Sequence, residues 1–216
     1  MVIEYKYADA NGYLDITQLL SDRIKETTYH ELTHAVHYSA LGNTWYTSLV
    51  NAEEYENEFG LSGYKPYGDG VNTTYSPIIA LGEAWGFHMG HFLEDQRYGV
   101  NSSCSDEGQT LYCPVYPTNP HHTHIEVLEN FNPYFTSDPI HWIPIGLMED
   151  LIDNTPTETW VNDQVSGFTI AQIFNAYQNN VTTVQQYKTT LINQNPTLPG
   201  GTTITQLNNL FSSYNY

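Results

Sequence analysis

The feature that most constrains this chain is the stretch from Thr27 to Gly42, which reads TTYHELTHAVHYSALG. At its centre His30 and His34 frame the pattern H-E-x-x-H, with Glu31 between them. On an α-helix, a step of four residues brings two side chains onto one face, one turn apart. Two imidazoles at that separation can bind one zinc ion, and the adjacent Glu31 can accept a proton from a water that the metal activates. The stretch therefore predicts a helix that carries part of a zinc site.

The residues around the motif have the spacing of a long helix. Asp15 followed by Gln18 matches a capping box, and apolar residues then recur at helical intervals up to Leu41. Gly42 is a C-terminal stop signal. We therefore expect the motif to lie inside one helix of roughly 25 residues. Residues 2–13, with Ile and Tyr at mostly alternate positions, predict a short strand or an extended lead-in.

The rest of the chain also has mainly helical patterns. A second helix is expected over Leu49–Phe59, and a third from Ser76-Pro77, an N-cap followed by proline, to about Tyr98. After Ser137-Asp138-Pro139 we expect a helix that carries the apolar residues from Trp142 to Ile152. Three shorter helices are expected over Thr169–Gln178, Thr183–Asn193 and Ile204–Ser213, the last two after T-x-x-Q capping boxes at Thr182 and Thr203.

These elements predict a mainly α fold, or an α+β fold with at most a small sheet. No internal repeat or low-complexity linker divides the chain, so we expect one domain over residues 1–216. Residues 1–99 would hold the helix with the histidines and a partner helix. Residues 100–216 would hold a loop and the C-terminal helices.

Composition excludes several partners. Six Lys plus Arg against 24 Asp plus Glu leave a formal charge of -18, which repels nucleic acid and anionic membranes. No run of eighteen apolar residues is present, so we expect no membrane-spanning segment. Abundant Tyr and scarce Lys favour an extracytoplasmic location, where Cys104 and Cys113 are expected to close a small disulfide loop. These cysteines lack the C-x-x-C spacing of a zinc site.

A catalytic zinc site needs a third protein ligand, and His37 does not fit the position. A straight helix cannot turn His37 back to a metal shared by His30 and His34, so we interpret it as a packing residue or as a neighbour of a ligand. The continuation H-x-x-G-x-x-H also fails, because His37 stands where Gly is needed and Ala40 where His is needed. This excludes the metzincin class.

Glutamates remain as third-ligand candidates. Glu53 and Glu54 lie 19 and 20 residues after His34, within a group of four acids among six residues that is typical of a solvated face. Glu83 lies 49 residues after His34 and is the only acid among residues 76–92. Burying a lone carboxylate costs several kcal/mol unless it is paired, and a zinc ion would pair it. We favour Glu83, with Glu53 or Glu54 as the alternative.

Glycines in the third helix support this choice. Gly82, Gly86 and Gly90 recur at every fourth residue, although each costs a helix roughly 1 kcal/mol relative to alanine. Together they predict a flat ridge that lets another backbone approach closely. The helix that carries the histidines is the expected neighbour.

The segments HELTHAVHY and GEAWGFHMG resemble the motifs of gluzincins, zincin metallopeptidases that use HExxH and a glutamate from a following helix. More specifically, they are similar to extracytoplasmic proteins of Bacteroidetes-type bacteria that are assigned as zinc peptidases. Those proteins share a G-E-x-W-like second motif and a C-terminal stretch like DQVSGFTIAQIF, and the resemblance covers roughly residues 25–190. It implies a zincin-like catalytic domain and a secreted, periplasmic or lipid-anchored protein whose signal lies upstream. The spacer before Glu83 is longer than in thermolysin-like enzymes, so substrate specificity does not transfer.

The resulting hypothesis is a zinc-dependent peptidase with one Zn²⁺ held by His30, His34 and Glu83. Glu31 would act as general base on a metal-activated water and then pass the proton to the leaving amine of a peptide or protein substrate. The alternatives are a catalytically silent surface or glycan/protein-binding module that retains the fold, and a metal-dependent hydrolase acting on a non-peptide amide or a glycoprotein.

Two further roles are needed around such a site. A Tyr or His side chain should stabilise the oxyanion, and we choose His141 because it precedes an apolar segment that can face the cleft. The other candidates for this role are Tyr75, Tyr98, Tyr134, His88, His91 and His124. A nearby acid should orient the zinc histidines, with Glu149 and Asp150 as candidates.

Overall fold

Seven α-helices make up most of the part of the chain that the structure describes. The structure is a computed structural model, and it describes residues 21–59, 67–68, 70–98, 142–153 and 161–216. The helices are α1 (Ser21–Leu41), α2 (Asn43–Phe59), α3 (Ser76–Tyr98), α5 (Leu147–Asp150), α6 (Ile170–Asn175), α7 (Val184–Gln194) and α8 (Ile204–Ser213), and the 3-10 turn η3 (Pro199–Gly201) precedes α8. Within these ranges there is no strand, which confirms the mainly α expectation, and no helix is long and apolar enough to cross a membrane. A zincin-like arrangement stays a prediction.

Some sequence predictions fall outside the described ranges. These are the lead-in over residues 2–13, the capping box that begins at Asp15, and the disulfide between Cys104 and Cys113. The grouping of residues 1–216 into one domain likewise stays a prediction.

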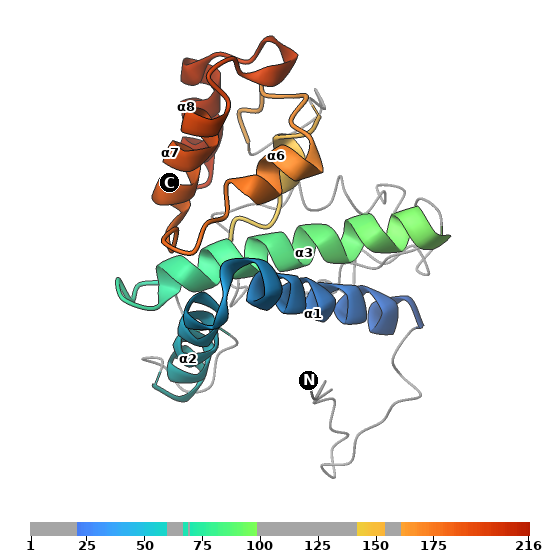
Figure 1. Cartoon of the computed structure of the whole chain (residues 1–216), viewed down its shortest axis with the longest axis vertical. Coiled ribbons are helices and arrows are strands. Elements are labelled where there is room, and N and C mark those ends of the chain that lie inside the picture. Colours follow the sequence, from blue (N-terminus) through green and yellow to red (C-terminus); the bar gives the residue numbers. More distant parts are fainter. Residues whose placement is uncertain (1–20, 60–66, 69, 99–141, 154–160) are drawn as a thin grey trace.

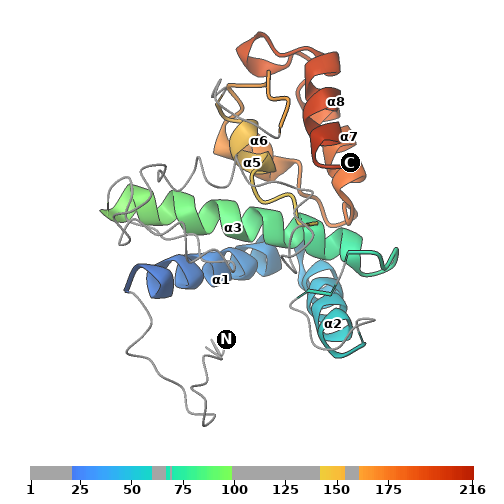
Figure 2. The same cartoon turned by 180° about the vertical axis from the view of Figure 1, so that it is seen from behind.

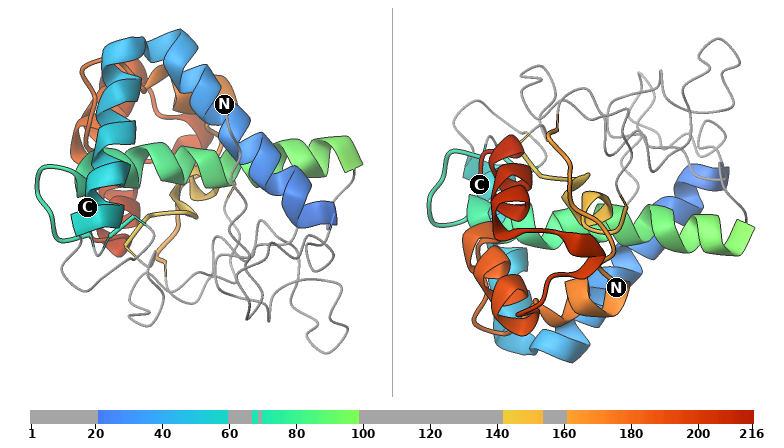
Figure 3. Two further views of the ribbon diagram at one scale, coloured as in Figure 1. Left: turned by 90° about the horizontal axis from the view of Figure 1, so that it is seen from below. Right: turned by 90° about the horizontal axis from the view of Figure 1, so that it is seen from above.

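Helix α3 is the centre of the fold. Helices α1 and α2 pack on one side of it, and α5 and α7 pack against it from the other side (Figures 1 and 2). Figure 3 shows that α1 crosses α3 obliquely. Every residue of α3 from 78 to 88 is buried, as expected for a helix that is apolar on all sides. Its bounds confirm the sequence prediction.

Gly42 separates α1 from α2. Its φ of +87° lies in the left-handed region, where glycine avoids the steric cost of a Cβ, and this confirms the predicted stop. Helix α2 begins at Asn43, earlier than the expected Leu49, because Trp45 is part of the core. The Trp45 side chain is 1% exposed, and its Nε1 donates a hydrogen bond to the Val181 carbonyl oxygen at 2.7 Å.

The helix expected after residues 137–139 is wrong for residues 142–146. The chain forms turns there, and only Leu147–Asp150 is helical. Pro144 explains the difference, because proline lacks an N–H donor and disfavours a helical conformation at Ile143 before it. Most apolar side chains of this segment are nonetheless buried in the core, and those of Trp142 and Ile152 pack against it while partly buried. Their pattern indicated burial correctly but not the local conformation.

Three helices near the C-terminus form where the sequence predicted them, although α6 is shorter than expected. Thr203 and Gln206 make the predicted capping box at the start of α8. Helix α7 is capped by Thr183, whose Oγ1 accepts a hydrogen bond from the Gln186 N–H at 3.1 Å. The predicted capping box of Thr182 with Gln185 is therefore wrong: the cap is the next residue, Thr183.

Asp163 lies between α5 and α6 with its charge close to that of Asp153. Burial raises the pKa of Asp163 from 3.8 to about 6. The Val165 N–H donates a hydrogen bond to Asp163 Oδ1 at 2.8 Å, which opposes the rise in pKa, and the negative charge of Asp153 adds to the rise. The folded state thus holds this proton more tightly than the unfolded state does. The free energy of unfolding therefore falls as the pH rises from about 4 to about 6.

We expect Asp163→Asn to raise the free energy of unfolding at pH 7 by about 1 kcal/mol. A pKa shift of about two units sets a ceiling of about 3 kcal/mol, which partial exposure of this half-buried side chain reduces. The amide keeps an oxygen for the Val165 N–H and removes the charge. Urea unfolding at pH 7 and pH 4 measures the effect, which should shrink towards pH 4. An equal gain at both pH values, or a loss at pH 7, contradicts this prediction.

Candidate metal centre

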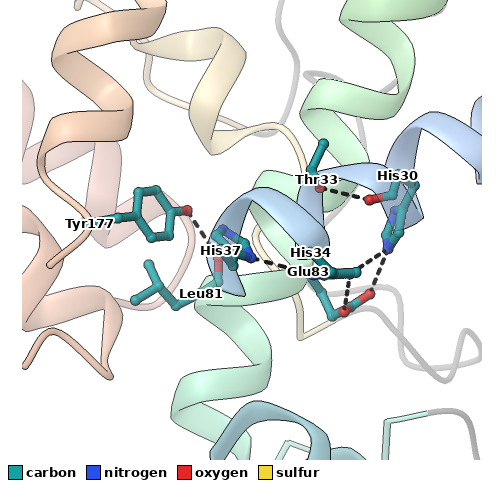
Figure 4. Close-up of polar contacts among 7 residues, drawn as sticks. All are labelled: His30, Thr33, His34, His37, Leu81, Glu83 and Tyr177. Atoms are coloured by element: carbon teal, nitrogen blue, oxygen red, sulfur yellow. Dashed lines mark hydrogen bonds and ion pairs between the residues drawn. The ribbon is translucent and has the colours of Figure 1, made fainter. Parts of the chain in front are cut away.

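The two histidines of the HExxH motif point from α1 towards α3. His30 and His34 are 7% and 8% exposed, and their Nε2 atoms lie 3.1 Å apart (Figure 4). The backbone between them is regular helix, and Thr33 Oγ1 donates a hydrogen bond to the His30 carbonyl oxygen at 2.7 Å. The expected one-turn separation on a single helical face is therefore present.

Glu83 of α3 completes the cluster. Its Oε2 lies 3.2 Å from His30 Nε2, and its Oε1 lies 3.1 Å from His34 Nε2 (Figure 4). The Glu83 side chain is 2% exposed. Among the described residues, this is the group of at least three His, Cys, Asp or Glu side chains whose ligand atoms converge as a metal site requires. Of the expected glutamates, Glu83 is thus the one placed against both histidines.

The spacing of the three side chains fits a small divalent ion. Four ligands at about 2.0–2.1 Å from a tetrahedral zinc lie about 3.3 Å from one another. The Nε2 atoms of His30 and His34 lie 3.1 Å apart, and each is near a different oxygen of Glu83, His30 Nε2 at 3.2 Å from Oε2 and His34 Nε2 at 3.1 Å from Oε1. Glu83 Oε2 is buried, with His30 Nε2 at 3.2 Å from it. Two imidazoles and a carboxylate are also a donor set that zinc prefers, so the residues present fit a metal ion.

The charge state of Glu83 suits a metal ligand. Burial opposes ionisation of this carboxyl, but the positive charges of His34 and His30 and their hydrogen bonds outweigh it and hold the pKa of Glu83 well below its usual value of 4.5. Metal ligands must be deprotonated, and a carboxylate that is already ionised costs no proton release on binding.

Glycines of α3 make room for the cluster. A Cβ placed on Gly86 would lie 2.7 Å from Cε1 and 2.8 Å from Nε2 of His30, closer than real Cβ contacts come. A Cβ on Gly82 would instead meet the end of the Leu49 side chain of α2, at 2.9 Å. The ridge predicted from the sequence therefore serves two helices: Gly86 admits the His30 ring of α1, and Gly82 admits α2.

Glu53, an alternative ligand in the sequence analysis, lies beside Glu83. Burial raises the pKa of Glu53 well above 4.5, and the charge of Glu83 and a hydrogen bond with Glu83 add to the rise. Glu53 is not a member of the convergent group, and Glu54 is exposed on α2. Glu53 is thus a hydrogen-bond partner of the glutamate in the cluster. No signal in the sequence indicated this contact.

Glu31, the expected general base, is half-buried at the edge of the cluster. It adjoins His30 in the sequence, and its charge raises the pKa of both Glu53 and Tyr46. Glu31 therefore lies on the side of α1 that is close to α2. Its partial exposure gives it access to solvent.

Other candidates for roles near the metal are placed elsewhere. His88 lies about 140° round the α3 axis from Glu83, on the basis of 100° per residue, and its Nδ1 pairs with Glu149 Oε2 of α5 at 3.1 Å. Asp150 accepts a hydrogen bond from the Tyr214 hydroxyl at 2.7 Å. These two acids were expected to orient the zinc histidines, and the structure gives them other partners. Tyr75 packs against another tyrosine, and His91 is buried in α3. His141, Tyr134, His124 and the side chain of Tyr98 lie outside the described residues.

His37 lies directly beside His34, one of the candidate metal ligands. It is fully buried, and its Nδ1 lies 3.4 Å from Nδ1 of His34 (Figure 4). Burial and the positive charge of His34 lower the pKa of His37 from 6.5 to about 3, so this imidazole is neutral at pH 7. Its predicted role as a packing residue or ligand neighbour agrees with this position. The aromatic rings of residues 174 and 177 that surround it could not be assigned from the sequence.

Comparisons of this chain with protein-family models, with curated proteins and with solved structures found no match. The likeness to gluzincin zinc peptidases therefore rests on the two motifs. What the structure adds is that these motifs, 49 residues apart from His34 to Glu83, meet in one buried cluster that can hold a metal ion.

We expect Gly86→Ala to weaken zinc binding at least tenfold, because the new methyl group would displace the His30 ring. Gly82→Ala is the matched control, since it makes the same change one helical turn away, where the nearest atoms to the new methyl group are the end of the Leu49 side chain and not a histidine. Competition with a coloured chelator measures the affinity, and circular dichroism checks the fold. Equal zinc affinity in wild type and folded Gly86→Ala would count against the cluster as the metal site.

Proposed function

We propose that this chain is a zinc-dependent peptidase. The observation that supports it best is the convergence of His30, His34 and Glu83 in one buried cluster, with Glu31 as the next residue along α1. A stabilising core does not require two histidines and an ionised glutamate on facing helices, because buried charges usually cost stability. A metal-binding role explains their presence.

In this proposal His30, His34 and Glu83 hold the ion. When bound, a zinc ion supplies Lewis acidity, which lowers the pKa of a water and polarises a carbonyl group. The buried walls of the cluster limit the entry of bulk water, so that charges act at a lower effective dielectric constant. The packing of α1 on α3, which Gly86 permits, holds the three ligand side chains close together before a metal binds.

Glu31 is the general base in this proposal. Its carboxylate accepts a proton from the attacking water and returns it to the amine that leaves when the peptide bond breaks. Two features support this role: Glu31 directly follows a candidate ligand, and it is partly exposed where His30 and His34 are buried. A substrate and water can therefore reach it.

His141 is our candidate for stabilising the oxyanion. It lies outside the described residues and directly precedes Trp142, which packs against the core. Its assignment rests on this position in the chain. We also propose an extracytoplasmic location, secreted, periplasmic or on a lipoprotein, on the basis of the composition. Both proposals are separate from the choice of metal ligands.

The test of catalysis uses Glu31→Gln with Glu54→Gln as the matched control, since Glu54 is an exposed acid on α2. On a generic fluorescent protein substrate, zinc-loaded wild type and Glu54→Gln should cleave at similar rates. Glu31→Gln should lose about 10²- to 10⁴-fold in rate, because the base is missing, and should bind zinc as the wild type does.

The outcomes separate the competing functions. If zinc-loaded wild type shows no peptide cleavage beyond that of Glu31→Gln, the peptidase proposal is refuted in favour of a catalytically silent binding module. If removing zinc with a chelator leaves cleavage unchanged, the metal does not take part in hydrolysis. Cleavage of an amide outside peptides, with peptides left intact, would assign a different hydrolase.

A further inference from the structure

His34 presents its two ring nitrogens to two different environments. Nε2 faces the cluster, at 3.1 Å from Glu83 Oε1 and 3.1 Å from His30 Nε2. Nδ1 faces away from the cluster, at 3.4 Å from Nδ1 of His37 (Figure 4). Among the described residues, His37 is the hydrogen-bond partner of this second nitrogen. In this hydrogen bond one of the two Nδ1 atoms carries the proton and the other accepts it.

If His34 is a metal ligand, the hydrogen bond between the two Nδ1 atoms must have His34 as donor and His37 as acceptor. Neutral imidazole carries a proton on one nitrogen and a lone pair on the other. If Nε2 of His34 gives its lone pair to a metal, the proton must be on Nδ1, and a neighbouring acceptor stabilises that tautomer. The usual acceptor is a carboxylate, a backbone carbonyl or water. Here it would be the Nδ1 lone pair of a second, neutral histidine.

The surroundings of His37 fix its orientation. Its ring centroid lies 4.9 Å from that of Trp45 and 5.5 Å from that of Tyr177, and the ring of Phe174 stacks on it at 6.5 Å. The polar atoms of Trp45 and Tyr177 bond elsewhere, to the carbonyl oxygens of Val181 at 2.7 Å and of Leu81 at 3.0 Å. Both rings are therefore held in place by helices and turns other than α1.

These rings leave the other nitrogen of His37 without a polar neighbour. His37 Nε2 is buried and has no hydrogen-bond partner among the described residues. A side chain kept for packing alone would avoid this cost, which is about 1–3 kcal/mol for a buried polar group. The contact of His37 Nδ1 with His34 explains a histidine at this position better than packing alone does.

We propose that His37 is a positioning residue: its Nδ1 accepts a hydrogen bond from Nδ1–H of His34 and holds His34 in the tautomer that binds metal through Nε2. The proton of His37 is then on Nε2, among the aromatic rings. This inference rests on the metal centre of the proposed function and not on hydrolysis. It also connects α6 and the turn after it, through Phe174 and Tyr177, to a ligand on α1.

Zinc affinity of two variants tests the proposal. His37→Phe keeps an aromatic ring in the cage and removes the acceptor, and we expect its zinc affinity to fall about 10- to 100-fold. His37→Asn loses the ring and keeps an amide oxygen near the position of Nδ1, so its affinity should stay within a few-fold of wild type. Tyr177→Phe is the control for the cage, because it removes the bond to Leu81 and leaves His37 intact.

Chelator competition gives the affinities, and thermal unfolding followed by circular dichroism shows that each variant is folded. The proposal is overturned if folded His37→Phe binds zinc like the wild type. It is also overturned if His37→Asn loses as much affinity as His37→Phe, or if Tyr177→Phe loses that much, since the aromatic packing would then be the cause.

A measurement without mutation gives a second test. In the zinc-loaded wild type, long-range ¹H–¹⁵N spectra of the imidazoles should show His34 protonated at Nδ1 and His37 protonated at Nε2. Protonation of His37 at Nδ1 would overturn the proposal. These tests use no substrate. If the protein binds zinc but cleaves nothing, the proposed peptidase function is refuted and the inference about His37 stands. If the wild type binds no zinc, both are refuted.

Discussion

The burial of an ionised glutamate between α1 and α3 is the interaction on which the rest of the site depends. A carboxylate removed from water costs several kcal/mol unless positive charge and hydrogen bonds compensate it. Here the compensation comes from His30 and His34 of α1, within 3.2 Å of Glu83. The same contact brings two sequence motifs together, and a bound cation would neutralise the cluster further.

Close approach of helices makes this contact possible. Gly86 leaves the space that the His30 ring fills, and a residue with a Cβ would close it. Three residues after His34 on α1, the His37 ring packs among aromatic rings that include those of Phe174 in α6 and Tyr177 just after it. The site therefore draws on four helices: α1 and α3 supply the candidate ligands, α2 supplies Glu53 beside Glu83, and α6 contacts His37, the neighbour of His34.

The features of the site that depend on local pattern could be predicted from the sequence. The HExxH spacing, the stop at Gly42 and a lone acid among glycines on an apolar helix were enough to bring Glu83 together with the two histidines. Features that depend on packing could not. The early start of α2, the turns around Pro144 and the contact of Glu53 with Glu83 follow from tertiary neighbours that no local spacing reports. The prediction that Glu149 or Asp150 orients the zinc histidines failed for the same reason, because their partners are the tertiary neighbours His88 and Tyr214.

The most direct measurement is an anomalous-difference map at the zinc absorption edge, from crystals of the zinc-loaded protein. One strong peak is predicted, within about 2.0–2.2 Å of His30 Nε2, His34 Nε2 and a carboxylate oxygen of Glu83. A peak held by other side chains, or full occupancy elsewhere with none between α1 and α3, would contradict a metal centre built from these residues.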